Sequence, residues 1–310
     1  MATTKSKKTT KSSKSKSAAS KTTTKKVVEV KKVVETKPVD AELEAHPMKG
    51  FFARKFDANE NILTIFKSPR IYGAILGEVI GTMFLTLILL TLGVYQPLYI
   101  MFGVIAISMA VFALSGANLN PIVTVGMMAT RRMSAIRGVV YLLSQVLGAW
   151  LAFLLANAFR STVEEPADFP QMAEVADGQF WLITMIEFVG AIMIAFFFAR
   201  ALAYKRSTFT FSAIYGGGVC VTLLFIIVVS STYLSLQNNF ILNPAAALMY
   251  QILPAGGENF GEVFGAICSA LLTYVIFPMI GGVLGFYLAD FAARLSGEHH
   301  CCGSNCPVKK

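Results

Sequence analysis

The sequence predicts an all-α membrane protein with six transmembrane helices, two re-entrant half-helices and an inverted 3+3 repeat. Three observations support this fold class. The chain is 55% hydrophobic and only 15% charged, whereas soluble domains carry about 25% charge. Six apolar runs are long enough to cross a bilayer, which takes about 20 residues per helix. Two shorter apolar runs each begin at an Asn-Pro pair, at matching positions in the two halves of the chain.

The chain begins with a basic tail over residues 1–38, rich in Lys, Ser and Thr. It has too little apolar surface to offset the entropy of ordering, so we expect it to be disordered. It lacks the apolar stretch of a cleavable signal peptide. Contact with anionic lipid or with nucleic acid is a second interpretation, because each Lys near an anionic surface contributes about 1 kcal/mol. Residues 39–70, with "MKGFFARKF", are expected to form an amphipathic segment at the membrane interface that leads into the first span.

The membrane domain is expected at residues 71–290. The half-helices are about a dozen residues long, which is too short to cross a bilayer. We place the half-helices at residues 119–130 and 241–253, and the six spans at residues 71–94, 98–117, 136–159, 180–203, 209–232 and 261–289.

The last segment, residues 291–310, is a tail that contains His and Cys residues. A structural zinc site needs a second complete pair of ligands at suitable spacing. We therefore expect an unstructured tail and no cofactor, with metal binding or acylation near the membrane as the alternatives. The cysteines concerned are Cys301, Cys302 and Cys306.

The distribution of Lys and Arg predicts the orientation in the membrane. Both termini are basic, and so are the breaks after the first half-helix and after the fourth span. The breaks after the first and fifth spans hold no Lys or Arg. The positive-inside rule then places both termini in the cytoplasm, which requires an even number of spans. We expect a multi-pass protein of the plasma or inner membrane.

The two halves share three landmarks in the same order. The segments "AILGEVIGTMFL" and "TMIEFVGAIMIA" both carry Glu-x-x-Gly, and Asn120-Pro121 matches Asn243-Pro244. The segment "YLLSQVLGAWLAFLLANAF" then matches "YVIFPMIGGVLGFYLADFA". Because each half has three spans, the halves cross the bilayer in opposite directions, which is an inverted-topology repeat.

The two Asn-Pro pairs predict a pore. Asn at the N-cap followed by Pro at the first helical position is a favourable start for a helix. Two such starts that enter from opposite sides meet near the middle of the membrane. Non-helical backbone is tolerated there only where it is buried in protein or lines a water-filled cavity. The half-helix N-termini disfavour cations, and the amides of Asn120 and Asn243 offer donors to a solute.

Two carboxylates inside the spans, Glu78 and Glu187, each need a partner. One interpretation is a proton or ion relay. The favoured interpretation is structural, because one glutamate stands in each half beside its half-helix. Each carboxylate would then accept hydrogen bonds from backbone N–H groups of a pore loop.

The segment "SGANLNPIVTVG" resembles "SGAHLNPAVTLG", a motif of the aquaporins and glycerol facilitators of the major intrinsic protein family. The resemblance covers about residues 70–290. It implies a homotetramer with one pore per subunit and passive conduction of water or small uncharged solutes such as glycerol. The partners would be these solutes, water and the lipid bilayer.

The resemblance also implies roles for single residues. It makes Asn120 and Asn243 the pore donors. It matches Phe102, in "MFGV", to an aromatic residue at the extracellular constriction, although the interval from Phe102 to Asn120 is about two residues shorter than usual. Gly116 would let the first loop pack closely. The residues that would support the pore loops are Glu78, Glu187, Pro121, Pro244 and Gly116.

Three positions depart from the family pattern. Ile122 stands where Ala is usual and is expected to reshape the contact between the half-helices. Asn118 stands where His is usual. Ala246 stands where the family has the main Arg of its constriction. A unit charge at ~5 Å in an effective dielectric of ~20 contributes about 3 kcal/mol, so its loss eases cation entry. The filter is predicted to be wide and apolar, suited to glycerol-sized neutral solutes or dissolved gases.

Two other classes of protein fit parts of this pattern. A secondary transporter also has inverted repeats and broken helices, but would need coupling carboxylates that face its site. A non-conducting member used for adhesion or membrane organisation would explain the missing Arg. An enzyme is not expected, because the spans carry no nucleophile–base pair and no set of metal ligands.

Overall fold

The computed structural model describes residues 62–162, 179–204, 207–233, 240–249 and 260–296. Within these ranges all regular structure is helical. The basic tail predicted at 1–38, most of the lead-in at 39–70 and most of the C-terminal tail, including its cysteines, lie outside the described residues.

Six helical segments are long and apolar enough to cross a membrane, with mean hydropathies of 2.0 to 2.3. The prediction of six spans is therefore confirmed. A short helix, α2 (Ile62–Lys67), precedes the first span. The spans are α3 (Pro69–Leu92), α4 (Pro97–Ser115), α6 (Ala135–Arg160), α7 (Phe180–Ala201) with its 3-10 turn η1 (Leu202–Tyr204), α8 (Thr208–Val228) with its π turn η2 (Val229–Tyr233), and the continuous run of α10 (Phe260–Leu271), η4 (Leu272–Ile276) and α11 (Phe277–Leu295).

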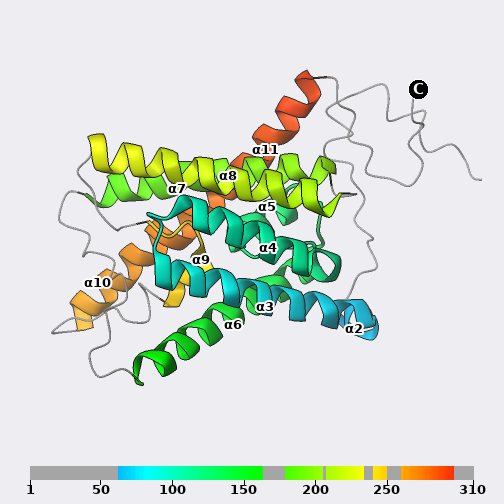
Figure 1. The fold of residues 1–310 in the computed structure, drawn as a ribbon, viewed down its shortest axis with the longest axis horizontal. Coiled ribbons are helices and arrows are strands. Elements are labelled where there is room, and N and C mark those ends of the chain that lie inside the picture. Colours follow the sequence, from blue (N-terminus) through cyan, green and yellow to red (C-terminus); the bar gives the residue numbers. More distant parts are fainter. Residues whose placement is uncertain (1–61, 163–178, 205–206, 234–239, 250–259, 297–310) are drawn as a thin grey trace, which may run out of the picture. The chain divides into compact units, whose positions relative to one another are not determined.

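Two short helices begin at the Asn-Pro pairs. They are α5 (Pro121–Ala129) and α9 (Pro244–Ala247), and each has Asn at its N-cap and Pro in its first turn. Residues 250–253 of the second predicted half-helix lie outside the described residues. Figure 1 shows α5 and α9 lying between the longer helices, where the two short helices contact each other. The predicted fold class, with six spans and two half-helices, is confirmed.

The packing repeats between the two halves. In the first half α3 packs against α6 and α4, and in the second half α7 packs against α11 and α8. Each half-helix also packs against the third span of the opposite half, because α5 contacts α11 and α9 contacts α6. This exchange locks the two repeats together around the half-helices.

Two glycines at equivalent positions make close helix contacts, Gly148 on α6 and Gly281 on α11. A Cβ atom at Gly148 would lie 2.4 Å from the carbonyl oxygen of Val79, and one at Gly281 would lie 2.6 Å from that of Phe188. Val79 and Phe188 each follow one of the two membrane glutamates. Gly148 and Gly281, which the sequence aligns in the third spans of the two halves, therefore make equivalent contacts. Small residues at such crossings let helix backbones approach closely in a membrane.

An ion pair joins the end of the first half-helix to the last span. The guanidinium of Arg132, just after α5, contacts the carboxylate of Asp290 on α11, and these side chains are 11% and 5% exposed. The same guanidinium lies over the ring of Phe286 at 5.2 Å from its centroid. A buried charge is tolerated when it is paired, so this pair fixes the far end of α5.

The glycine contacts yield a stability prediction. Gly148→Ala and Gly281→Ala each place a methyl group against a backbone carbonyl that has no room to move away. We expect each change to lower the stability of the detergent-solubilised protein by about 1–3 kcal/mol, the range for overpacking. Thermal unfolding followed by circular dichroism measures this.

The matched control is Gly217→Ala, on α8. A Cβ atom at Gly217 would meet nothing within 4 Å, so this variant should unfold at or slightly above the wild-type temperature, because Ala favours a helix more than Gly does. Equal effects of all three alanines would contradict the assignment of Gly148 and Gly281 as helix contacts.

Candidate pore site

Both asparagines cap their own half-helices. The side-chain oxygen of Asn120 accepts a hydrogen bond from the N–H of Ile122 at 3.0 Å. That of Asn243 accepts from the N–H groups of Ala245 at 3.1 Å and Ala246 at 3.4 Å. The Oδ1 atom of each amide therefore satisfies backbone donors at the start of the helix, and the NH₂ group points the other way.

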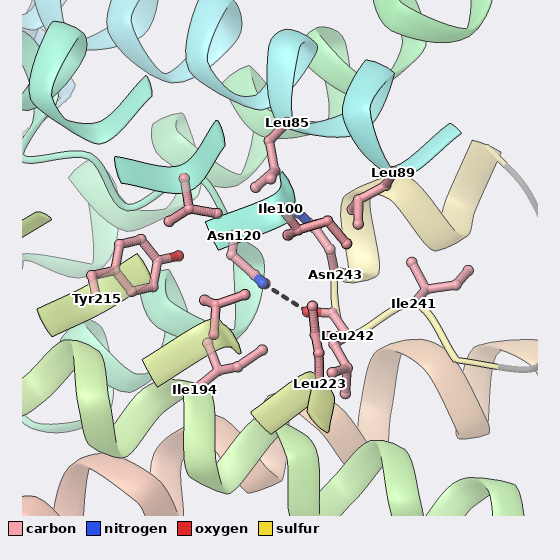
Figure 2. A pocket seen from close by; sticks show the side chains of 12 residues that line it. Leu85, Leu89, Ile100, Asn120, Ile194, Tyr215, Leu223, Ile241, Leu242 and Asn243 are labelled. Atoms are coloured by element: carbon pink, nitrogen blue, oxygen red, sulfur yellow. Dashed lines mark hydrogen bonds between the residues drawn. The ribbon is translucent and has the colours of Figure 1, made fainter. Parts of the chain in front are cut away.

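The NH₂ groups cross to the opposite loop. The Nδ2 atom of Asn120 donates to the carbonyl of Leu242 at 2.8 Å, the bond drawn dashed in Figure 2. The Nδ2 atom of Asn243 donates to the carbonyl of Leu119 at 3.3 Å. Each of these carbonyls belongs to the residue just before the opposite asparagine. An amide NH₂ carries two donor hydrogens, and each crossing bond uses one of them.

The leucines before the two asparagines have unusual backbone conformations. Leu119 has a φ of 59° and Leu242 a φ of 53°, both in the left-handed region. Such a conformation costs about 1–3 kcal/mol for a residue other than glycine. The strain is located at the two residues whose carbonyls receive the crossing bonds. The left-handed turn is thus part of the geometry that joins the loops.

In each Glu-x-x-Gly landmark, the glycine lies against the side chain of one of these leucines and the glutamate binds its backbone. A Cβ atom at Gly81 would lie 2.3 Å from a side-chain carbon of Leu119, and one at Gly190 would lie 2.5 Å from one of Leu242. One turn earlier on each helix, the glutamate accepts the N–H group of the same leucine. The spacing of three residues thus pairs a carboxylate for the leucine backbone with a space for the leucine side chain.

The glutamate carboxylates are buried against the pore loops. Glu78 accepts from the backbone N–H groups of Asn118 at 3.0 Å and Leu119 at 2.8 Å. Glu187 accepts from Ile241 at 2.6 Å and from Leu242 at 3.2 Å. Carboxylates that receive backbone N–H groups are strong charge-assisted acceptors. The contacts match the structural interpretation and not the relay.

The first loop has an additional side-chain anchor. Gln145 on α6 donates from its Nε2 atom to Glu78 at 2.7 Å and to the hydroxyl of Thr124 on α5 at 2.8 Å. In the second half the aligned residues are Pro278 and Ala247, which carry no side-chain donor. The matching segments of the two halves place Gln145 opposite Pro278, and the contacts show that Gln145 links α6 to Glu78 and Thr124.

A cavity of about 30 Å³ lies beside the two asparagines. This exceeds the roughly 10–15 Å³ that a cavity needs to hold one water molecule. Nine of its lining residues are aliphatic, and the polar ones are the two asparagines and a tyrosine. The lining residues are Leu85, Leu89, Ile100, Val104, Asn120, Ile194, Tyr215, Val219, Leu223, Ile241, Leu242 and Asn243.

Comparison with known proteins decides the family. The family model described as major intrinsic protein matches residues 65–288. The chain belongs to the major intrinsic protein family. With its six spans it is a multi-pass membrane protein, and the family consists of membrane channels.

Two relatives illustrate this membership of the major intrinsic protein family. The chain is 29% identical over 238 residues to glycerol uptake facilitator protein-like 6 of Lactiplantibacillus plantarum, covering 72% of this chain and 97% of that protein. The fold is also similar to the X-ray structure of the aquaglyceroporin from Plasmodium falciparum, with a TM-score of 0.50 and 17% identity, over 71% of this chain and 99% of that one.

Phe102 does not line the described cavity, and its place at the extracellular constriction stays a prediction. The Phe102 side chain is 63% exposed, on the face of α4 that points away from the cavity. Ile100 and Val104 line the cavity instead, one helical turn apart. Two residues along a helix rotate a side chain by about 200°, so Ile100 and Phe102 lie on opposite faces of α4.

The structure places three further residues that the sequence singled out. Ile122 contacts α11, because a Cβ at Gly282 would lie 2.8 Å from an Ile122 side-chain carbon. Asn118 points its amide at Thr124 and is not among the cavity residues. Gly116 ends α4 with a φ of 85°, and a Cβ there would meet nothing within 4 Å. Its role is therefore to permit a left-handed C-cap, not close packing.

Ala246 lies in the first turn of α9, where its side chain is fully buried in the main apolar core. It is not among the residues that line the cavity beside the asparagines. The segments 234–239 and 250–259, which flank this half-helix in sequence, lie outside the described residues. The role of Ala246 in the filter stays a prediction.

The carboxylate contacts predict the effect of neutral substitutions. Glu78→Gln and Glu187→Gln keep the side-chain shape but present an NH₂ group to backbone donors. We expect each to destabilise the protein by about 1–3 kcal/mol for each group left unsatisfied, measured by thermal unfolding in detergent. Glu262→Gln, an exposed carboxylate on α10, is the control and should leave the unfolding temperature unchanged. Wild-type stability of the first two variants together with a change in pH-driven transport would favour the relay interpretation.

Proposed function

We propose that this protein is a passive channel for water and small uncharged solutes of glycerol size. The observation that carries the proposal is the crossed pair of Asn120 and Asn243 on the wall of an apolar cavity, between two half-helices that meet inside the fold. Each amide keeps one donor hydrogen for a solute oxygen. A hydroxyl-bearing solute would accept from these amides while its carbon atoms contact the aliphatic wall.

The same wall would disfavour ions. Among the residues that line the described cavity, none carries a charge. An ion that enters loses hydration and gains no charged partner, which costs far more than for a neutral molecule. Donors supplied by amides favour a neutral acceptor and oppose a cation. This supports uncharged solutes as the substrate class.

The alternative of a secondary transporter lacks support from the described contacts. A coupling carboxylate would have to face the transport site and change its protonation or ion ligation. Glu78 and Glu187 instead accept loop N–H groups and do not line the cavity. The non-conducting alternative is opposed by the cavity itself, since the crossed asparagines stand at a space and not in a closed core.

The comparisons support the solute class. A glycerol uptake facilitator-like protein and an aquaglyceroporin are both similar to this chain. We propose that the filter beside Ala246 is wider than one with Arg at that position. Such a filter would favour glycerol or larger neutral solutes over strict selection of water.

Orientation and assembly also stay predictions. Basic residues follow α5 and α7 in the sequence, which supports a cytoplasmic location of these two breaks and of both termini. We propose location in the plasma or inner membrane. We also propose the homotetramer that the family resemblance implies and a contact of the N-terminal tail with anionic lipid.

A flux assay tests the proposed function. The full chain is reconstituted into proteoliposomes, and volume change in water, glycerol and urea gradients is followed by stopped-flow light scattering. We expect water and glycerol permeabilities well above those of empty vesicles, with no saturation at high solute concentration. Saturation would favour a transporter, and permeabilities equal to those of empty vesicles would favour a non-conducting protein.

The crossed amides predict a change of conduction for Asn243→Asp. The carboxylate keeps the capping acceptor for α9 but lacks the donor to Leu119 and adds a negative charge beside the cavity. We expect lower glycerol flux and a measurable cation leak per assembled protein, read with a potential-sensitive dye. If solute flux and ion exclusion both match wild type, Asn243 does not line the conducting pathway.

A larger, charged side chain at position 246 is predicted to lower both the glycerol flux and any cation leak. Ala246→Arg would add a bulky, permanently charged donor, and we expect it to reduce glycerol flux more than water flux and to lower any cation leak. Ala246→Ser, a small polar change, is the matched control and should keep the wild-type ratio. If Ala246→Arg fails to assemble while Ala246→Ser assembles, position 246 belongs to the packed core and not to the filter.

A further inference from the structure

Tyr215 is a buried tyrosine whose hydroxyl reaches the pore cavity. It lies on α8 with 1% of its surface exposed, and it is one of three polar residues on the cavity wall. Its hydroxyl donates to the carbonyl of Asn118 at 3.5 Å. Figure 2 shows its ring beside Asn120, on the opposite side of the cavity from Ile241. No step of the proposed function described so far uses this side chain.

Tyr215 lies at a different depth in the membrane from the two asparagines, so a solute would pass them one after the other. Successive spans alternate in direction, so α4 ends on the same side of the membrane on which α8 begins. Tyr215 is seven residues into α8, about 10 Å along the helix axis. Asn118 precedes Asn120 on the loop that rises from that side. The phenol therefore bridges α8 and this loop between the membrane face and the asparagine pair.

The ring is held firmly on its far side. The ring of Phe198 on α7 meets it edge-on at a centroid distance of 4.9 Å, and Phe211 lies at 6.3 Å. Edge-to-face aromatic contacts of this kind are favourable. On the loop side the phenol makes the long hydrogen bond to the carbonyl of Asn118.

We propose that Tyr215 is a specificity-determining residue, which sets the size limit in the half of the pore built on the first loop. The described cavity is only about 30 Å³, so the bulk of the side chains on its wall limits the size of the solute that passes the asparagines. Tyr215 is the largest side chain on that wall, and its hydroxyl bond is at the long limit for a hydrogen bond. The inference rests on the proposed function and places a second size filter away from Ala246.

The test uses full-length protein in proteoliposomes and three solutes: water, glycerol and a five-carbon polyol. Tyr215→Leu removes the ring, Tyr215→Phe removes only the hydroxyl, and Phe225→Leu is the matched control on the exposed side of α8. We expect Tyr215→Leu to raise the ratio of polyol to glycerol permeability on the order of tenfold, the scale of a methylene-sized change in an apolar site. Tyr215→Phe should raise the ratio less, and Phe225→Leu should leave it unchanged.

The outcomes separate this inference from the proposed function. If wild type conducts and both Tyr215 variants keep its polyol-to-glycerol ratio, Tyr215 does not set the size limit, while the channel function stands. If Tyr215→Leu fails to assemble, Tyr215→Phe decides alone, because it keeps the aromatic contacts, and an unchanged ratio overturns the inference. If wild type conducts none of the three solutes, the proposed function fails and the inference fails with it.

Discussion

The crossed hydrogen bonds between the two pore loops are the constraint on which the rest of the site depends. Each asparagine uses its oxygen to start its own half-helix and its nitrogen to hold the carbonyl before the other asparagine. A buried carbonyl without a donor costs about 1–3 kcal/mol, and the amide of the opposite loop supplies that donor to each leucine carbonyl. Neither loop therefore satisfies its polar groups without the other.

The other features of the site follow from that exchange. To aim its carbonyl across, each leucine adopts a left-handed backbone, and the neighbouring span must then hold a strained residue. A glutamate takes the leucine N–H group and a glycine one turn later admits its side chain. The exchange of half-helices, in which α5 packs on α11 and α9 on α6, holds the spans of both halves around the junction.

The two halves are not held by equivalent side chains. In the first half Gln145 on α6 donates to Glu78 and to Thr124 of α5, and just after α5 the ion pair of Arg132 and Asp290 reaches α11. At the aligned positions the second half has Pro278 and Ala247. The pi-helical turn η4, just before Pro278, lies against α9. Proline has no N–H to donate into the helix, so the second half-helix rests on a less regular span than the first.

The sequence by itself determined the six spans, the two half-helices and the repeat, because hydrophobic length, Asn-Pro starts and Glu-x-x-Gly spacing are local signals. It also pointed to Glu78 and Glu187, since an isolated carboxylate in a span needs donors. The Leu before each Asn-Pro was visible twice in the sequence, yet its left-handed backbone was not, because that conformation is imposed by the partner loop.

Only the tertiary structure decided which side chains face the cavity. Phe102 and Ile100 are two residues apart and equally apolar, and the packing of α4 against α3 and α8 selects Ile100. Tyr215 carries no sequence signal of its own, since a tyrosine in an apolar span reads as core. Its place beside Asn118, 97 residues earlier in the chain, arises because two distant segments fold around one space. Hydropathy patterns report that a residue is buried, but the rotation and contact of helices decide what it is buried against.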